Sequence, residues 1–220
     1  MNNKQVTIID YGMGNILSLS RALAYCGASV VLTDSARKIE QADCLILPGV
    51  GAFGDGIKEL EQRGIIPAIQ SFIKKGKPFL GICLGMQMLF DFSVEFGRHD
   101  GLSLINGSVM PLPSSQADGT KNKIPHISWN QIYPFDKDQD LWHNTILENI
   151  KLGSYLYFLH SFHVQPLVQT DIIAITPFYD YNFPSVIARE NIHGVQFHPE
   201  KSGPVGLSIL KNFIALTENV

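Results

Sequence analysis

Residues 78–87 read Pro-Phe-Leu-Gly-Ile-Cys-Leu-Gly-Met-Gln, and this stretch decides the fold. Its apolar first half, 78–83, is typical of a buried strand, and the glycines on either side of Cys83 mark a sharp turn into a helix that begins near Leu84. A strand that turns directly into a helix is the repeating unit of a parallel sheet covered by helices. Cys83 stands at the turn, where such folds expose a nucleophile.

Strands and helices alternate in the same way before this stretch. In such sheets ligands bind beyond the carboxyl ends of the strands, so Gly12, residues 49–51 and Cys83 should converge on one rim. The alternation predicts an α/β fold with a mostly parallel sheet flanked by helices. The expected strands are 6–10, 30–33, 43–47 and 78–83, and the expected helices are 18–26, 55–62 and 66–75.

The second half of the chain has a different pattern. Residues 109–123 are rich in Pro, Ser and Gly and predict a surface loop. Segments rich in Tyr, Phe and Ile predict extra antiparallel strands joined to the same sheet, and they are 155–162, 172–176, 185–189 and 192–197. A closing helix is expected at 206–217. Because 220 residues fit one large domain, we expect a single domain over 1–220.

Composition argues against several classes of partner. A net charge of −3 gives no electrostatic reason to expect nucleic acid or an anionic membrane as a partner. No apolar run reaches the ~18 residues of a membrane span. The three cysteines lack Cys-x-x-Cys spacing, and residues 1–4 show no signal peptide, so we expect free thiols in a cytoplasmic protein. We expect neither a metal nor a cofactor.

The surroundings of Cys83 favour a reactive sulfur. Gly81 and Gly85 let the neighbouring backbone pass close to the turn, and the free N–H groups of the following helix favour a thiolate and can hold an oxyanion. Cys26 lies in a helical pattern and Cys44 in an apolar strand. These two are expected to be ordinary buried thiols, as most lone cysteines are.

A histidine and a carboxylate lie close together further along, in Val-Gln-Phe-His-Pro-Glu-Lys-Ser at 195–202. In an extended segment, the side chains of His198 and Glu200 lie on one face, so the carboxylate can orient the imidazole. Pro199 fixes φ and is expected to keep the segment extended. Together with Cys83, these residues predict a nucleophilic triad.

Three further motifs have plain structural alternatives. Pro-Gly-Val-Gly at 48–51 is a candidate oxyanion element, but a simple tight turn explains it about as well. Asp-Tyr-Gly-Met-Gly-Asn at 10–15 resembles the start of a dinucleotide loop, but Leu17 stands where its third glycine should be, so nucleotide binding is not expected. His160 and His163 should point to opposite faces of one strand and should not chelate a metal.

The two motifs around Cys83 and His198 resemble those of the class I (triad) glutamine amidotransferases, and the likeness covers nearly the whole chain in order. The Pro-Gly-Val-Gly loop separates it from the anthranilate and carbamoyl phosphate relatives. Further stretches resemble one branch, the glutaminase subunits of imidazole glycerol phosphate synthases. They are 10–15, 47–53 (Leu-Pro-Gly-Val-Gly-Ala-Phe), 123–130 (Lys-Ile-Pro-His-Ile-Ser-Trp-Asn) and 157–161 (Tyr-Phe-Leu-His-Ser).

The resemblance implies a flavodoxin-like domain that hydrolyses glutamine and channels ammonia to a (β/α)₈-barrel cyclase subunit. In histidine biosynthesis, that cyclase forms imidazole glycerol phosphate and an aminoimidazole carboxamide ribotide. The implied roles are Cys83 as nucleophile, His198 as general base and acid, and Glu200 as its orienter; Leu84 and Val50 or Gly51 as oxyanion donors; Gln87, Glu95, Ser161 and Phe162 as glutamine-binding residues; and Asn15, Trp129, Tyr157 and Lys201 at the partner interface.

Three other functions remain open at this point. Ser128, Phe162 and the stretch 101–105 depart from the usual pattern of the histidine-pathway branch. A paralogous glutaminase that supplies ammonia for amidination of a surface sugar is therefore an alternative. A stand-alone cysteine hydrolase would explain Cys83 and His198, but it would not explain Gln87 and Glu95. A non-catalytic module that only activates its partner has no need of the whole triad.

Overall fold

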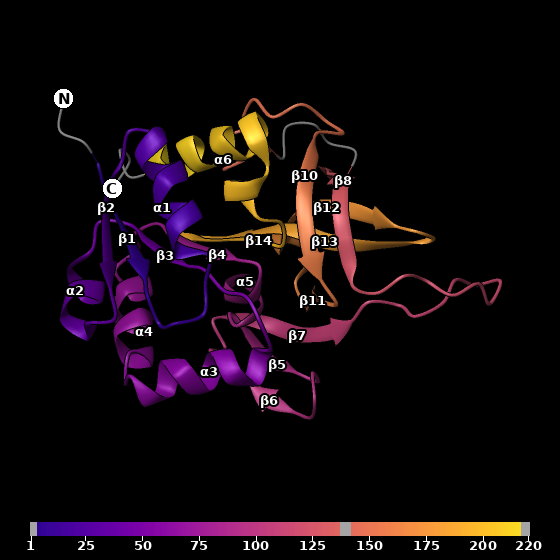
Figure 1. Ribbon diagram of the computed structural model, residues 1–220, viewed down its shortest axis with the longest axis horizontal. Coiled ribbons are helices and arrows are strands. Elements are labelled where there is room, and N and C mark those ends of the chain that lie inside the picture. Colours follow the sequence, from indigo (N-terminus) through magenta and orange to yellow (C-terminus); the bar gives the residue numbers. More distant parts are fainter. Residues whose placement is uncertain (1–3, 137–141, 217–220) are drawn as a thin grey trace.

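The computed structural model describes residues 4–136 and 142–216. In this part of the chain, the central sheet has eight strands in the order β2-β1-β3-β4-β14-β13-β12-β9 (Figure 1). The parallel strands are β2 (Ser29–Thr33), β1 (Gln5–Ile9), β3 (Leu45–Leu47), β4 (Phe79–Ile82) and β14 (Ile192–Val195). The antiparallel continuation consists of β13 (Tyr181–Arg189), β12 (Ile172–Phe178) and β9 (Tyr133–Pro134).

Helices cover both faces of this sheet (Figure 1). Buried residues such as Leu23 and Phe213 form a core on one face, and Leu60 and Ile69 belong to a second core on the other. Apolar side chains recur on one side of each of these helices, and their burial against the sheet stabilises the layers. The first face carries α1 (Ile16–Tyr25) and α6 (Gly203–Ala215), and the second carries α2 (Ala36–Gln41), α3 (Phe53–Gln62) and α4 (Ile66–Lys74).

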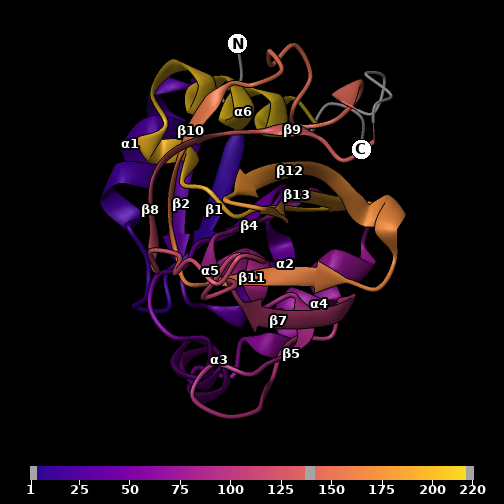
Figure 2. The ribbon, with the colours of Figure 1, turned by 90° about the vertical axis from the view of Figure 1, so that its right-hand side faces the viewer.

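Two smaller sheets are built from the middle of the chain and pack beside the central sheet (Figure 2). In one, β8 (His126–Gln131) pairs antiparallel with β10 (Tyr155–His160). The other has the order β11-β7-β5-β6, with β11 (Phe162–Pro166), β7 (Ile105–Pro111), β5 (Phe90–Ser93) and β6 (His99–Asp100). Ser161 joins β10 to β11, so one continuous stretch of chain connects the two small sheets.

The expected α/β class with a mostly parallel, helix-flanked sheet is confirmed, but several details of the second half were wrong. The segment 155–162 does not join the central sheet. Its strand is interrupted at Ser161, and the residues before and after Ser161 pair with β8 and β7, respectively. Strand β14 is antiparallel to β13 but parallel to β4. Sequence pattern reports which residues suit a strand, whereas the pairing partner depends on distant parts of the chain.

Element boundaries also moved. Residues 109–111 end strand β7 and do not belong to the expected loop. Helix α2 was not predicted, since its six residues are too few to give a clear period. The closing helix begins at Gly203, three residues before the expected start, and its expected last residue, Thr217, lies outside the described residues. Over the described ranges, no helix combines the length and apolar character that crossing a membrane requires.

Candidate active site

Cys83 lies in a strained turn between β4 and the short helix α5 (Leu84–Gln87). Its backbone angles are φ 54° and ψ −110°, a conformation that L-residues rarely adopt and that strains a side-chain-bearing residue. The flanking glycines make the turn possible. A Cβ on Gly81 would lie 2.8 Å from the backbone of Gly85, and one on Gly85 would overlap the carbonyl oxygen of Leu47.

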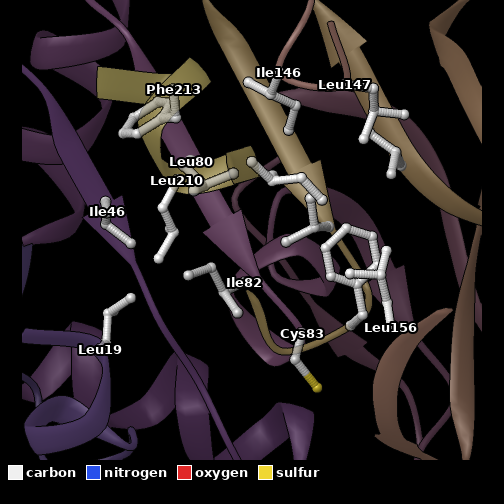
Figure 3. Close-up of a cluster of buried hydrophobic side chains, with 14 of the residues drawn as sticks. Leu19, Ile46, Leu80, Ile82, Cys83, Ile146, Leu147, Leu156, Leu210 and Phe213 are labelled. Atoms are coloured by element: carbon white, nitrogen blue, oxygen red, sulfur yellow. The ribbon is translucent and has the colours of Figure 1, made fainter. Parts of the chain in front are cut away.

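The Cys83 side chain belongs to one hydrophobic core and lies at its edge (Figure 3). Figure 3 shows its sulfur directed away from the cluster of apolar side chains that includes Ile82 and Leu156. Cys83 is 6% exposed. Its sulfur lies 3.8 Å from the carbonyl oxygen of Leu159, and the amide Nε2 of Gln196 donates a hydrogen bond to it at 3.6 Å.

His198 and Glu200 are in direct contact. Nδ1 of His198 lies 3.0 Å from Oε1 of Glu200, and both side chains are 2% exposed. The sequence predicted an extended segment here, and that prediction was wrong. Residues Pro199–Lys201 form a 3₁₀ turn, η3, and the Oγ of Ser202 donates to the carbonyl oxygen of His198 at 2.7 Å. The predicted contact is therefore correct, but a tight turn brings it about.

The charge state of His198 follows from its neighbours. Burial opposes a charge on the ring, but the interactions with Cys83 and Glu200 outweigh this effect and raise the pKa of His198 to about 10. Its Nε2 is buried and makes no hydrogen bond to any described residue. The neighbours thus favour the charged ring, with one nitrogen fixed by Glu200 and the other available to a reacting group.

A small cavity of about 100 Å³ opens beside Cys83. The residues that line it come from the elbow, the loop after β3, strand β5's end and the β10–β11 junction, and they are Val50, Gly51, Cys83, Leu84, Gln87, Glu95, Leu159, His160, Ser161 and Phe162. All the expected oxyanion and glutamine-binding residues are in this set.

Two of the lining side chains are held by backbone groups. Gln87 is 5% exposed, and its Nε2 donates to the carbonyl oxygen of Phe162 at 2.9 Å. The Oε2 of Glu95 accepts a hydrogen bond of 2.7 Å from the N–H of Phe53, the first residue of helix α3. A carboxylate at a helix N-terminus is stabilised by the unpaired N–H groups and the helix dipole. Gln87 and Glu95 are therefore fixed before any ligand binds.

The Pro-Gly-Val-Gly loop is anchored by a hydrogen bond from Tyr11. The phenol of Tyr11 is buried and donates to the carbonyl oxygen of Pro48 at 2.8 Å. Gly49 has no room for a side chain, because a Cβ there would lie 2.7 Å from both Leu84 and the Tyr11 oxygen. Gly51 has a φ of +107°, a value that only glycine adopts easily. The first peptide of the loop is thus fixed, and Val50 and Gly51 follow it at the cavity wall.

The residues expected at a partner interface lie together outside the site. The rings of Trp129 and Tyr157 meet edge to face with centroids 6.1 Å apart, and the Lys201 ammonium lies 5.8 Å from the centre of the Tyr157 ring. Asn15 borders a narrow space that also touches Val50 and His198. Trp129 is half exposed. Asn15 therefore adjoins His198 directly, whereas Trp129, Tyr157 and Lys201 form a group of their own next to Glu200 in the chain.

Other candidate residues have structural surroundings. Cys26 and Cys44 contact the carbonyl oxygens of Leu207 and Gln5, and burial raises the pKa of Cys44 to about 12. The premise for His160 and His163 was wrong, because they belong to different strands of different sheets. Within residues 4–136 and 142–216, no three His, Cys, Asp or Glu side chains are grouped so that they could hold a metal ion.

Sequence reasoning missed several residues of the site. Gln196 reaches Cys83 from the strand end before His198, and Tyr11 supports the loop. His160 lines the small cavity, although sequence reasoning had considered it only as a metal ligand and had rejected that role. The signal for Gln196 was available, since it is a polar side chain within an otherwise apolar segment.

A model of the class-I glutamine amidotransferase family matches residues 7–216. The elbow, the His198–Glu200 contact and the lined cavity agree with that match, and the chain belongs to the class-I glutamine amidotransferase family. Within the family it falls among the HisH subunits of imidazole glycerol phosphate synthase.

Individual comparisons support both steps. The chain is 50% identical over 211 residues to imidazole glycerol phosphate synthase subunit HisH 1 of Legionella pneumophila (strain Paris), covering 96% of this chain and 99% of that protein. It is 46% identical over 208 residues to subunit HisH of Sulfurimonas denitrificans, covering 94% and 96%. A solved structure of a glutamine amidotransferase superposes with a TM-score of 0.72 at 16% identity, covering 97% of this chain and 98% of that one, which shows the shared fold alone.

Proposed function

We propose that this chain hydrolyses glutamine through Cys83, His198 and Glu200 and passes the ammonia to a (β/α)₈-barrel cyclase subunit in histidine biosynthesis. The observation that carries the proposal is the position of Cys83. Its sulfur borders a small cavity lined by Gln87 and Glu95, and Cys83 and Glu200 together raise the pKa of His198, whose ring Glu200 orients through a 3.0 Å contact. A nucleophile, a proton carrier and an orienting carboxylate are the parts of acyl-transfer chemistry.

The first half of the reaction forms a thioester. A protonated imidazole beside a cysteine favours the thiolate, and the Cys83 sulfur attacks the side-chain carbonyl carbon of glutamine. The resulting oxyanion is held by the N–H of Leu84 at the start of α5 and by an N–H of Val50 or Gly51. His198 then donates its Nε2 proton to the nitrogen as the carbon–nitrogen bond breaks, so ammonia leaves and the acyl group stays on sulfur.

The second half releases glutamate. His198, now neutral, takes a proton from a water molecule, and the hydroxide that forms attacks the thioester carbon. The carbon–sulfur bond breaks and the sulfur leaves as a thiolate, which restores the pair of thiolate and imidazolium. Glu200 remains an anion throughout and stabilises the imidazolium without accepting its proton.

Glutamine binding is assigned to the polar wall of the cavity. The carboxylate of Glu95 suits the substrate ammonium group, because its contact with the helix N-terminus already holds it in place. Gln87 and the backbone at Ser161 and Phe162 suit the main-chain end of the substrate. Such pairing would favour the free amino acid over a peptide, which has no free ammonium and carboxylate on the same carbon.

The partner proposal rests on the surface beside the triad. Ile127, Trp129 and Tyr155 are each more than half exposed and lie on the two-stranded sheet of β8 and β10. Exposed apolar side chains on one face are typical of a surface that another protein covers. Free ammonia in water is mostly protonated and no longer a nucleophile, so a sealed exit past Asn15 and Lys201 into the barrel would preserve it. A cytoplasmic location belongs to the same proposal.

The test is glutamate release from glutamine by the purified chain mixed with the cyclase barrel of the same organism, with and without the open-ring ribonucleotide that the cyclase consumes. We expect low turnover with the barrel alone and strong stimulation by the nucleotide, because partner and acceptor complete the oxyanion hole. A rate of hydrolysis that does not change with the nucleotide would support the glutaminase activity but reject the histidine-pathway assignment. No glutamate under any condition would reject the proposal as a whole.

A further inference from the structure

Buried polar side chains form a continuous hydrogen-bond network from strand β8 toward the small cavity. Nδ2 of Asn130 lies 3.2 Å from Nε2 of His126, and Nδ1 of His126 lies 3.1 Å from Nε2 of His160. Nδ1 of His160 lies 2.9 Å from the carbonyl oxygen of Phe162. Each histidine is 6% exposed, so this part of the hydrogen-bond network runs through the interior.

The inner half of this hydrogen-bond network continues from the Phe162 carbonyl to the sulfur of Cys83. Nε2 of Gln87 donates both to the carbonyl oxygen of Phe162 at 2.9 Å and to Oε1 of Gln196 at 3.2 Å. Nε2 of Gln196 in turn donates to the sulfur of Cys83. Because both amide protons of Gln87 are engaged in this way, the position of Gln87 depends on where the Phe162 carbonyl is held.

Geometry fixes which nitrogen of each ring carries the proton. Asn130 is oriented by the backbone, since its Nδ2 donates to the carbonyl oxygen of Pro177 at 2.7 Å and its Oδ1 accepts from the next N–H at 2.8 Å. It therefore presents an N–H to Nε2 of His126, which accepts. A neutral His126 then donates from Nδ1 to Nε2 of His160, and His160 donates from Nδ1 to the Phe162 carbonyl.

The surroundings keep both rings neutral. Burial lowers the pKa of His126 to about 4, and burial followed by the neighbouring His126 lowers the pKa of His160 to about 3. The rings of Phe158, Phe178 and Phe183 pack around His126 with centroids 5.1, 5.3 and 5.7 Å away. A second proton on His160 would also face the N–H of His126. One protonation pattern thus satisfies all four ring nitrogens.

His193 provides a contrast within the same protein. It is also a buried histidine whose pKa burial lowers to about 4. Its Nδ1, however, has no hydrogen-bond partner among the residues that the structure describes. Burial of a histidine in this fold does not by itself produce a paired arrangement, and the fully paired His126 and His160 differ from it in that respect.

We propose that His160 is a positioning residue for glutamine and that His126 fixes its tautomer. His160 lines the small cavity and holds the Phe162 carbonyl, which in turn holds Gln87. His126 lines a second, open cavity of about 520 Å³ on the outer side, so the pair joins the surface at β8 to the glutamine cavity. The inference rests on the proposed function, because it takes glutamine as the occupant of the small cavity.

The test compares labelling of Cys83 in the full chain by two electrophiles. Diazo-oxo-norleucine mimics glutamine and must occupy the cavity, whereas iodoacetamide needs only the sulfur. His160→Phe keeps the ring volume and removes the hydrogen bonds, His160→Asn places an amide nitrogen where Nδ1 lies, and His193→Phe is the matched control.

We expect His160→Phe to raise the half-saturating concentration of diazo-oxo-norleucine about tenfold, with the iodoacetamide rate unchanged. His160→Asn should keep the half-saturating concentration close to that of wild type, because it still donates to the Phe162 carbonyl. His193→Phe should change neither the half-saturating concentration of diazo-oxo-norleucine nor the iodoacetamide rate. Equal half-saturation in His160→Phe and His193→Phe would overturn the proposal. So would equal slowing by both reagents in His160→Phe, which would indicate general damage.

A second measurement uses the unmodified protein and needs no variant to fold. Nitrogen-15 NMR of the histidine rings should place the proton on Nδ1 in both His126 and His160. A proton on Nε2 of either ring would overturn the proposal whatever the labelling shows. Labelling requires no cyclase, so failure of the partner assignment leaves this test intact. If diazo-oxo-norleucine never labels wild-type Cys83, the glutaminase chemistry fails, and the NMR result still decides the tautomers.

Discussion

The Nδ1 atom of His198 lies 3.0 Å from Oε1 of Glu200, although the two residues are separated only by Pro199. The 3₁₀ turn after His198 brings the carboxylate back to the ring. This contact leaves Nε2 as the ring atom that can exchange a proton at the site, and within the described residues no hydrogen bond occupies it. The turn therefore sets the direction of the imidazole, and Glu200 acts together with Cys83 to raise the pKa of His198.

Replacing Glu200 by Gln tests that contact. The amide keeps the shape of the carboxylate but loses the charge that stabilises the imidazolium, so kcat for glutamate release should fall by about 10²–10⁴-fold with a small change in KM. Glu61→Gln, an exposed change on α3, is the matched control. A Glu200→Gln enzyme with more than half of the wild-type kcat would remove Glu200 from the triad.

Tyr11→Phe tests the support of the Pro-Gly-Val-Gly loop. Burial, with a contribution from Cys83, raises the pKa of Tyr11 well above its usual range, so the phenol keeps its proton and donates to the Pro48 carbonyl at any working pH. Its loss leaves a buried carbonyl unpaired and should cost roughly 1–3 kcal/mol of stability. We also expect kcat to fall about tenfold with little change in KM, since the loop supplies an oxyanion donor.

The matched control for this change is Tyr25→Phe, because Tyr25 is 75% exposed on helix α1. Urea unfolding and steady-state glutamate release should be measured for both variants. If Tyr11→Phe and Tyr25→Phe behave alike in both measurements, the Tyr11 hydrogen bond does not support the loop.

Gly85→Ala tests the close approach at the elbow. A methyl group there would overlap the carbonyl oxygen of Leu47, a backbone atom of a central strand that cannot move aside. We expect a loss of roughly 1–3 kcal/mol or more in the free energy of unfolding, together with loss of activity. An unchanged urea midpoint would mean that α5 can shift away from β3 without cost.

His193 predicts a pH dependence of stability. Burial lowers its folded-state pKa to about 4, below the ~6.5 of an unfolded histidine. Between these values the unfolded state binds more protons, so stability is fully present above pH ~6.5 and is lost as the pH falls toward 4, at about 1.4 kcal/mol per pH unit. In His193→Phe this contribution is absent.

Urea unfolding of both proteins at several pH values between 4.5 and 6.5 measures the difference directly, because the contributions of other groups cancel. The free energy of unfolding of wild type should fall more steeply with decreasing pH than that of His193→Phe. Parallel curves would show that His193 is protonated to the same extent in the folded and unfolded states.

The sequence predicted the parts of the fold that local pattern controls. The strands of the parallel half were placed within two residues, because apolar runs bounded by Gly and Pro are a clear signal. The elbow at Cys83 and the contact of His198 with Glu200 were also predicted, since each depends on neighbours in the chain.

What the sequence could not provide depends on distant contacts. Ser161 divides one apolar stretch between two sheets, and its neighbours on either side pair with β8 and β7. The contact of Gln196 with Cys83 spans 113 residues, and that of Tyr11 with Pro48 spans 37. Tyr11 is an ordinary core residue by pattern, and the polar Gln196 stands out in its apolar segment, but only the folded arrangement reveals what the two side chains contact.

The most direct test of the central claim is to measure glutamine hydrolysis and covalent labelling in wild type and in Cys83→Ala. Wild type should release glutamate in the presence of the cyclase and its nucleotide, and diazo-oxo-norleucine should label Cys83 alone, as located by mass spectrometry. Cys83→Ala should lose all hydrolysis while keeping its circular dichroism spectrum and its binding to the cyclase. Undiminished hydrolysis by Cys83→Ala, or labelling at Cys26 or Cys44, would contradict the account.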